Sequence, residues 1–333
     1  MERKLASIRK ISNIEPIEGA DAIELATVDG WKVVVAKNVN HKIGDFVVYC
    51  EIDSFLPIKE EFEFLRKSSY KKMSDGTEGF RLRTIKLRGQ ISQGLIMPIS
   101  ILVGLDDFVI GTDVSEILGI VKYEPPIPAE LAGKIKGNFP SFIPKTDEER
   151  IQNLSSDYES FKDRLFYESE KLDGSSATFY SKDRQFGVCS RNLDLLETDG
   201  NTFWKVAREL DLENKLKNYN IALQGELIGE GIQGNPYNIK GQTVRFFNIF
   251  YINSQTYANL EEFLNWMIDL DLKSVPILKT DFKLPNTIEE ILLLADGKSA
   301  LNKDTDREGL VIRSLDRTVS FKVISNKFLL KEK

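Results

Sequence analysis

The sequence is poor in the residues that carry much of enzyme chemistry. It has one histidine, His41, and two cysteines, Cys50 and Cys189, which lie far apart in the chain. A Ser-His-Asp triad, a zinc hydrolase or a multi-histidine iron site would need imidazoles that the chain does not contain. The cysteines give neither a disulfide framework nor zinc-ligand spacing. We therefore expect both to be buried as small hydrophobic side chains, and His41 to be a solvated loop residue.

Long apolar runs are absent too. No stretch reaches the length of about 18 apolar residues that a membrane-spanning helix needs, and the N-terminal Met-Glu-Arg-Lys lacks the apolar core of a secretion signal. The sequence therefore predicts an intracellular protein, cytoplasmic or nuclear, with no membrane partner. The net charge of −6 excludes a basic nucleic-acid coat. A local positive strip could still contact phosphates, and its candidates are Arg81, Arg83, Lys86 and Arg88.

Length and patterning indicate two domains. A chain of 333 residues, 41% of them hydrophobic, exceeds the size at which one core usually keeps growing. Residues 1–105 show short apolar runs separated by turn residues, which is typical of a small β-barrel. An oligonucleotide-binding (OB) barrel fits this size, and a structural barrel with a solvated face stays open. One strand should have a solvent-exposed face, with Arg81, Arg83 and Arg88, and a buried dry face, with Leu82, Ile85 and Leu87.

Residues 106–145 are the expected connection between the domains. Five prolines between Lys122 and Lys145 exclude a regular helix or a central strand. From residue 146 to 333 the pattern predicts an α+β domain of antiparallel sheets. Thr146 and Glu149 form a possible capping box for a helix at 147–153, and helical spacing recurs at 201–210 and 259–270. The expected strands are 176–180, 221–228, 244–252, 309–312 and 319–323.

Two phosphate-binding motifs are present only in part. Gly229 to Gly234 satisfies GxGxxG, but Asn235 and Pro236 oppose the helix that would hold a pyrophosphate. The run Gly297-Lys298-Ser299 lacks the earlier glycine of a P-loop, because residue 292 is leucine. Neither run therefore predicts a nucleotide site.

A different series of motifs is ordered along the second domain. Glu170-Lys171-Leu172-Asp173-Gly174 alone is a weak signal that an ordinary surface turn could produce. Four further motifs and a final lysine follow it: Ser190-Arg191-Asn192, Gln224 to Leu227, Arg245 to Ile249, Arg307 to Arg313, and Ser320 to Val323 with Lys322. The series resembles the covalent nucleotidyltransferases, which are the ATP-dependent DNA and RNA ligases and the mRNA capping enzymes. A β-rich module before the catalytic domain resembles most the small RNA ligases with an N-terminal OB barrel.

The resemblance implies that Lys171 attacks ATP and forms a covalent lysyl-AMP. A free lysine has a pKa near 10.4, so we expect desolvation and a neighbouring metal cation or lysine to lower the pKa of Lys171. By the same resemblance, Glu226 and Glu308 hold Mg²⁺ or Mn²⁺ and the ribose, as suits hard divalent ions. Asp173 supports the site beside the lysine, and Lys322 neutralises charge on the α-phosphate.

The resemblance also implies a wider nucleotide-binding set. Arg191 would contact phosphate or ribose, and Phe247 would stack on adenine, although a Phe in an apolar strand is as often a core residue. The other members of this set are Arg150, Glu170, Glu226 and Lys322, with Lys327. Many relatives carry two lysines one residue apart in the last motif, whereas here Lys327 is the next lysine after Lys322. Asn248 stands where relatives often have Asp, so no acidic role is assigned to it.

The sequence thus predicts an ATP-dependent RNA ligase that seals 3′-OH and 5′-phosphate ends in RNA repair. A DNA ligase, a GTP-using capping enzyme and a catalytically decayed RNA-binding protein are the alternatives. The expected partner is nicked or broken RNA. The sequence leaves the oligomeric state open, with a monomer as the expectation.

Overall fold

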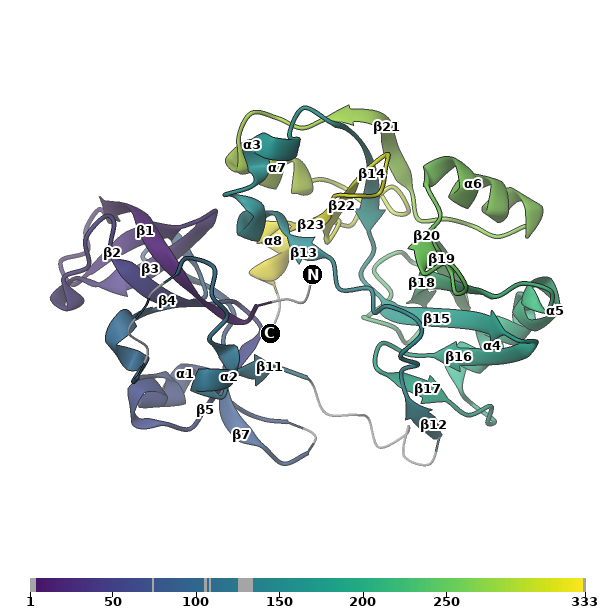
Figure 1. Cartoon of the computed structure of the whole chain (residues 1–333), viewed down its shortest axis with the longest axis horizontal. Coiled ribbons are helices and arrows are strands. Elements are labelled where there is room, and N and C mark those ends of the chain that lie inside the picture. Colours follow the sequence, from purple (N-terminus) through teal and green to yellow (C-terminus); the bar gives the residue numbers. More distant parts are fainter. Residues whose placement is uncertain (1–3, 74, 105–106, 108, 125–133, 332–333) are drawn as a thin grey trace. The chain divides into compact units, whose positions relative to one another are not determined.

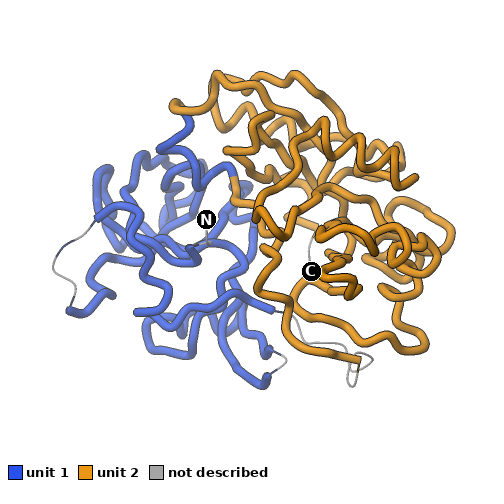
Figure 2. The backbone as a smooth tube through the Cα atoms, turned by 45° about the vertical axis from the view of Figure 1, so that its right-hand side comes forward, with its two compact units in different colours: residues 1–127, 151–158, 332–333 blue, residues 128–150, 159–331 orange. Residues whose placement is uncertain are grey.

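Short strands form most of the structure. Some, such as β3 (Trp31–Ala36), alternate buried and less buried residues, whereas others, such as β22 (Gly309–Ser314), are buried on both faces. The computed structural model describes residues 4–73, 75–104, 107, 109–124 and 134–331 (Figure 1). Mixed α+β architecture with antiparallel sheets and few helices confirms the predicted fold class. The chain divides into two compact units (Figure 2): residues 1–127, 151–158 and 332–333, and residues 128–150 and 159–331.

The first unit is built on a five-stranded antiparallel sheet. Its strand order is β10-β4-β1-β2-β3. Alternate residues of these strands, such as Ala6, Ile8 and Val48, lie in one apolar core. The strands are β1 (Ala6–Pro16), β2 (Ile23–Val28), β3 (Trp31–Ala36), β4 (Phe46–Cys50) and β10 (Leu95–Pro98).

A second sheet and a hairpin complete this unit. The second sheet has the order β11-β5-β7-β6, and β8 pairs only with β9. Val114, Leu118 and Ile120, which belong to the predicted connecting segment, lie in the core of this unit. The elements are β5 (Ser54–Pro57), α1 (Arg66–Ser69), β6 (Tyr70–Lys72), β7 (Glu78–Arg81), β8 (Thr84–Leu87), β9 (Gln90–Gln93), α2 (Ser115–Leu118) and β11 (Val121–Lys122).

The predicted helix at 147–153 is wrong. Glu149–Arg150 is the short strand β13, and Ile151–Leu154 is a single 3₁₀ turn. The backbone of Glu149 and Arg150 does not form a helix, because β13 pairs in parallel with a strand of the second unit. The next residues bind the first unit: Asn153 accepts from the Trp31 indole (2.6 Å) and donates to Glu51 (2.5 Å). Long-range contacts thus override the local capping signal.

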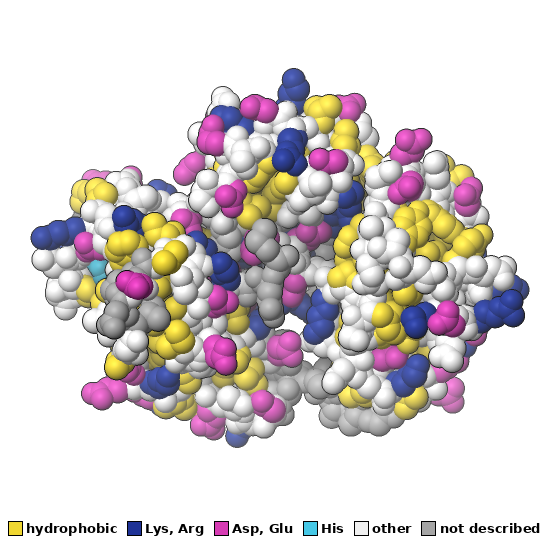
Figure 3. Space-filling view, viewed as in Figure 1, with side chains coloured by type: hydrophobic (Ala, Val, Ile, Leu, Met, Phe, Trp, Pro, Cys, Tyr) yellow, Lys and Arg dark blue, Asp and Glu magenta, His cyan; other side chains and the backbone are white. Residues whose placement is uncertain are grey.

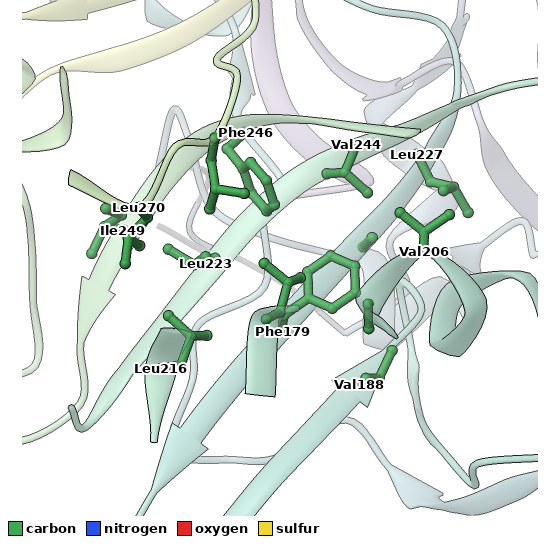
Figure 4. Close-up of a cluster of buried hydrophobic side chains, with 14 of the residues drawn as sticks. Phe179, Val188, Val206, Leu216, Leu223, Leu227, Val244, Phe246, Ile249 and Leu270 are labelled. Atoms are coloured by element: carbon green, nitrogen blue, oxygen red, sulfur yellow. The ribbon is translucent and has the colours of Figure 1, made fainter. Parts of the chain in front are cut away.

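The second unit holds a seven-stranded sheet with helices on one face. Its order is β12-β17-β16-β15-β18-β19-β20, all antiparallel. Figure 4 shows the core on this face, where Phe179, Leu223 and Phe246 meet side chains of the helices. The elements are β12 (Ile135–Asn138), β15 (Ser175–Lys182), β16 (Gln185–Cys189), β17 (Leu193–Leu195), α4 (Thr202–Glu209), α5 (Leu212–Leu216), β18 (Ile221–Gly229), β19 (Gln242–Tyr251), β20 (Thr256–Tyr257) and α6 (Leu260–Asp269).

A five-stranded sheet forms the rest of this unit. Its order is β13-β23-β22-β14-β21. The remaining elements are α3 (Tyr158–Phe161), β14 (Leu165–Lys171), β21 (Ile277–Lys283), α7 (Ile288–Ala295), β22 (Gly309–Ser314), β23 (Ser320–Ile324) and α8 (Asn326–Leu329). The strands and the two helices that the sequence predicts in this domain, apart from 147–153, are confirmed. Residues 125–133, within the predicted proline-rich connection, lie outside the described residues.

The expectations for the two cysteines and for the histidine are also met. Cys50 and Cys189 are free and buried, and His41 is a partly exposed loop residue. Within the described part of the chain, every helix is too short or too polar to cross a membrane. Acidic, basic and hydrophobic side chains are interspersed over the face shown in Figure 3, so no field of one sign covers it.

Candidate active site

Lys171 lies where the chain passes from one sheet of the second unit to the other. It is the last residue of β14 in the five-stranded sheet, and β15 of the seven-stranded sheet begins at Ser175. The turn between them has no room for a side chain at Gly174, because a Cβ there would lie 2.5 Å from the carbonyl oxygen of Leu227. A glycine lets the backbone approach this closely. The turn is therefore packed closely against Leu227 of the seven-stranded sheet.

Three carboxylates surround the Lys171 amine. Its Nζ lies 2.7 Å from Oε1 of Glu308, which precedes Gly309, the partner of Lys171 in the β14–β22 ladder. Glu226 and Asp173 also act on the charge of Lys171. Glu226 faces away from the helix-covered core, because its neighbour Leu227 lies in that core. The structure thus brings together Lys171, Asp173, Glu226 and Glu308 from three separate motifs.

The pKa values of Glu226 and Lys171 are both raised in this cluster. Burial raises the pKa of Glu226 to about 8; Lys171 opposes this rise, and the carboxylates of Glu308 and Asp173 add to it. Burial alone would lower the pKa of Lys171, but Glu308 and Glu226 outweigh it, so the pKa of Lys171 is raised. Desolvation thus acts in the predicted direction, but without a neighbouring cation the carboxylates outweigh it. The carboxylates stabilise the protonated amine.

The last motif shares a face with the nucleophile. In the ladder registers Lys171 pairs with Gly309, and Val311 pairs with Lys322. Side chains two residues apart on a strand point to the same face, so Lys322 and Lys171 lie on one face of the sheet. Arg150 on β13 is buried, and it lies beside Lys322 in the parallel register of β13 and β23.

The loop that imitates a dinucleotide motif supports the nucleophile turn. Tyr237 is buried against Leu172 and Ile228, and its hydroxyl accepts a hydrogen bond of 2.5 Å from the backbone N–H of Asp173. Gln233 donates to the carbonyl oxygen of Gly174 (3.4 Å). The sequence analysis gave this loop no role. The sequence signal for this supporting role was the polar run after Gly229, which was interpreted only as an incomplete GxGxxG motif.

A buried polar network joins the two sheets. Arg313 binds Glu148 (2.7 Å), and burial, which opposes ionisation of Glu148, is outweighed by Arg313 and Ser320, so the pKa of Glu148 is lowered. Arg317 donates to Asn248 (3.0 Å), and Asn248 donates to Gln224 (3.2 Å). An amide can both accept and donate. This double role gives a reason for asparagine at position 248.

Phe247 and Arg191 border the site in different ways. The β18–β19 register shifts between Gln224 and Gly225, which leaves Phe247 as the bulged residue. A bulge redirects a side chain, and Phe247 packs against the cluster that contains Leu172, with the Arg313 guanidinium 5.9 Å from its ring centre. Arg191 is exposed and pairs with Asp147 (2.8 Å), yet it lies close enough to Glu226 to oppose the rise in its pKa.

Two residues of the predicted nucleotide-binding set lie apart from this face. Glu170 alternates with Lys171 on β14, so its side chain points to the opposite face, where it accepts from the backbone N–H of Ala300 (2.7 Å). Lys327 is in α8, largely exposed, and pairs with Asp296 (3.2 Å). Arg245, to which the sequence analysis gave no role, lies opposite Glu226 on β19, and burial lowers its pKa.

The residues present fit a divalent cation held in part by its substrate. Among the described residues no group of three His, Cys, Asp or Glu side chains is placed as a complete ligand set. Glu226 and Glu308 can supply two carboxylates, and burial, with a smaller contribution from the neighbouring carboxylates, raises the pKa of Glu226. Mg²⁺ typically takes one or two carboxylates together with water and substrate phosphates.

A lysine on a strand end, with acids from later strands and a second lysine on the same face, defines the class of covalent nucleotidyltransferases. The family profile described as RNA ligase matches residues 164–328, and one described as an OB-fold domain matches residues 5–99. Among curated proteins, none matches this sequence.

Solved structures of Naegleria gruberi RNA ligase are similar over nearly the whole chain. The structure with pyrophosphate has 47% identity and a TM-score of 0.92, and 99% of each chain is covered. A ligand-free aspartate-to-alanine variant has 46% identity and a TM-score of 0.93, with 99% of this chain and 98% of that chain covered. A lysine-to-alanine variant with ATP and manganese has 46% identity, a TM-score of 0.92 and 99% coverage of both chains. The chain belongs to the RNA ligase family.

Proposed function

We propose that this protein is an ATP-dependent RNA ligase that works through an AMP bound covalently to Lys171. The observation that carries the proposal is one amine, fixed at the junction of two sheets, 2.7 Å from Glu308 and on the same face as Lys322. Relatives of the same fold have been solved with ATP, with AMP and with pyrophosphate. Joint retention of Lys171, Asp173, Glu226, Glu308 and Lys322 argues against a decayed site.

The reaction has three transfers. The deprotonated Nζ of Lys171 attacks the α-phosphorus of ATP; the P–N bond forms, and the bond to the β-phosphate oxygen breaks and releases pyrophosphate. The AMP then passes to the 5′-phosphate of an RNA end, which frees the lysine. The 3′-hydroxyl attacks that phosphate, loses its proton and displaces AMP as the strand closes. Lys322, on the face of Lys171, would stabilise charge on the α-phosphate.

The proton on Lys171 must be lost before the first transfer. Glu308 and Glu226 hold that proton on Lys171 in the protein alone. A divalent cation, Mg²⁺ or Mn²⁺, bound to Glu226 and Glu308 would compensate both carboxylates, favour the neutral amine and bind substrate phosphates. Asp173, beside the lysine on the fixed turn, would maintain the geometry. We expect no activity without such a cation.

The other residues would bind the nucleotide. Phe247, re-aimed by the bulge, would stack on adenine, and Arg191 could leave Asp147 to contact phosphate or ribose. Arg150, beside Lys322, would contribute a second positive charge. Glu170 would act through its backbone, because its side chain is turned away, and Lys327 would need to leave Asp296 to reach a phosphate.

Transfer of label tests the proposal. The protein is incubated with α-labelled ATP or GTP, without RNA, and label bound to the protein is counted. We expect label from ATP alone, none with Lys171→Arg, and release of label on adding RNA with a 5′-phosphate end. Label from GTP would indicate a capping enzyme. No label from either nucleotide, with RNA binding intact, would indicate a decayed ligase.

Nicked duplexes test the substrate. Matched duplexes whose 3′-hydroxyl strand is RNA or DNA are compared, and we expect faster sealing of the RNA strand. Equal sealing would remove the preference for RNA. The two buried free thiols are consistent with an intracellular, reducing compartment, which we also propose.

A further inference from the structure

A short hairpin projects from the first unit with an unusual surface. It consists of β8 and β9 joined at Arg88 and Gly89, which both have positive φ, 46° and 83°. Its tip exposes two apolar side chains, Ile85 (44%) and Leu87 (39%), beside exposed Lys86 and Arg88. The predicted dry face is therefore correct for Leu82, which is buried, and wrong for Ile85 and Leu87. These side chains meet solvent because β8 has no neighbour other than β9 in the described sheets.

The base of the hairpin is anchored. Ser92 is buried and accepts from the backbone N–H of Val34 (3.0 Å), and the carbonyl oxygen of Gln93 accepts from the Tyr49 hydroxyl (3.0 Å). Gln93 also donates to Thr84 across the hairpin (3.3 Å). A ligand at the tip therefore meets a pre-positioned ribbon and would order little additional chain on binding.

The hairpin concentrates positive charge in an acidic protein. No aspartate or glutamate occurs between Glu78 and Asp106, although the chain carries a net charge of −6. Some other cations of this unit are paired, for example Arg9 with Asp29 (3.0 Å) and Arg66 with Glu63 (2.6 Å). Within the described residues, no carboxylate pairs with Lys86 or Arg88.

Arg81 does not contribute to the unpaired positive charge of the hairpin. It pairs with Asp53 (2.9 Å), and its guanidinium lies 4.6 Å from the ring centre of Tyr123. The predicted strip of four cations is thus reduced to Lys86 and Arg88 at the tip and Arg83 at the hairpin base. Arg81 has a structural partner, and the others do not have one among the described residues.

The side chains at the tip of the hairpin favour contact with phosphates over recognition of bases. Cations attract the phosphate backbone of a nucleic acid, and this attraction is independent of base sequence. Base recognition by stacking needs aromatic side chains, and residues 82–93 contain none.

We propose that the β8–β9 hairpin binds the phosphate backbone of the RNA substrate through Lys86 and Arg88, without reading its sequence. This inference rests on the proposed RNA ligase function and assigns a substrate contact to the first unit. It makes a quantitative statement about salt, because each phosphate contact on a duplex adds about 0.9 to the slope of log affinity against log salt concentration.

The test compares two double variants with the same loss of charge. Lys86→Ala with Arg88→Ala removes the tip cations. Lys42→Ala with Lys67→Ala removes two exposed lysines of the same unit that have no ion pair among the described residues. Affinity for a nicked RNA duplex is measured from 50 to 300 mM salt, a range chosen to be about the physiological one.

For the tip variant we expect a slope smaller by about 2 and, with affinities that converge near about 1 M salt, an affinity roughly 60-fold lower near about 0.1 M salt. The control variant should keep the parent's slope, and the exchange Lys86→Arg with Arg88→Lys should restore it. Changing the base sequence around the nick should leave the ratio of parent to variant affinity unchanged. Labelling from ATP without RNA reports separately on whether each variant is folded.

Three outcomes would overturn the hairpin contact: an unchanged slope in the tip variant, an equal loss in the control variant, or a loss that depends on base sequence. An unchanged RNA slope together with lost binding to anionic phospholipid vesicles would assign the tip to a membrane surface instead. Failure of the parent itself to form lysyl-AMP would refute the proposed function, and this result is distinguishable because that assay contains no RNA.

Discussion

Tyr237 offers a sharp test of how the nucleophile is positioned. Its hydroxyl accepts from the backbone N–H of Asp173, two residues after Lys171, and its ring packs against Leu172 and Val275. Tyr237→Phe removes one oxygen and keeps the ring. Burial raises the pKa of the phenol, so the hydroxyl is neutral and the hydrogen bond does not titrate near neutral pH.

The cost follows from the group left behind. A partly buried N–H without a partner costs about 1–3 kcal/mol. In a domain of this size each kcal/mol lowers the melting temperature by about 2–4 °C. The same hydrogen bond fixes the turn that carries Lys171. We therefore expect about 1 kcal/mol of this cost to raise the activation free energy of lysyl-AMP formation, which slows that step about fivefold.

The assay is single-turnover transfer of label from ATP, with melting measured in parallel. Tyr219→Phe is the matched control: it removes the same atom from a half-exposed ring that packs on Trp266. The control should keep both values of the parent. Adenylylation by Tyr237→Phe at the parental rate, well below the melting temperature, would refute a positioning role for this bond.

Three further predictions concern single residues. Gly309→Ala should destabilise the protein by about 1–3 kcal/mol or more and impair labelling, because a Cβ would lie 2.1 Å from the carbonyl oxygen of Val323; Gly137→Ala, with open space, should be tolerated. Without divalent cations, thermal unfolding should show stability falling as pH rises from about 4.5 towards 8, because Glu226 holds its proton more tightly when folded, and Glu226→Gln should flatten this slope. Asn248→Ala should cost about 1–3 kcal/mol in chemical denaturation, and Asn248→Asp less, because Asp still accepts from Arg317.

Each of these has a clear contrary result. Equal melting temperatures for the Gly309 and Gly137 variants would contradict the close approach of β22 and β23. A parental pH slope in Glu226→Gln would show that other groups cause it. A larger loss for Asp than for Ala at position 248 would show that the donated hydrogen bond to Gln224 dominates.

The sequence by itself determined the order of the chemistry and most of the strands. Lys171, Glu226, Glu308 and Lys322 could be proposed because the ordered series of motifs that contains them resembles the covalent nucleotidyltransferases. The strands around them were predictable from apolar runs, and the helix at 259–270 from its spacing, to which the structure adds a capping box at Asn259. These signals are local, so a single chain carries them.

Only the tertiary structure decided which groups meet. Thr146 and Glu149 carry a helix signal, yet β13 forms because β23 supplies a partner more than 150 positions later. Tyr237 reaches Asp173 from a loop that reads as a failed motif. The faces of Glu170 and Lys171 could not be assigned from the sequence, because both sides of β14 are largely buried and alternation gives no contrast. The charge state of Lys171 depends on three carboxylates, two of which, Glu308 and Glu226, are distant in sequence, and electrostatic energy depends on distance in space.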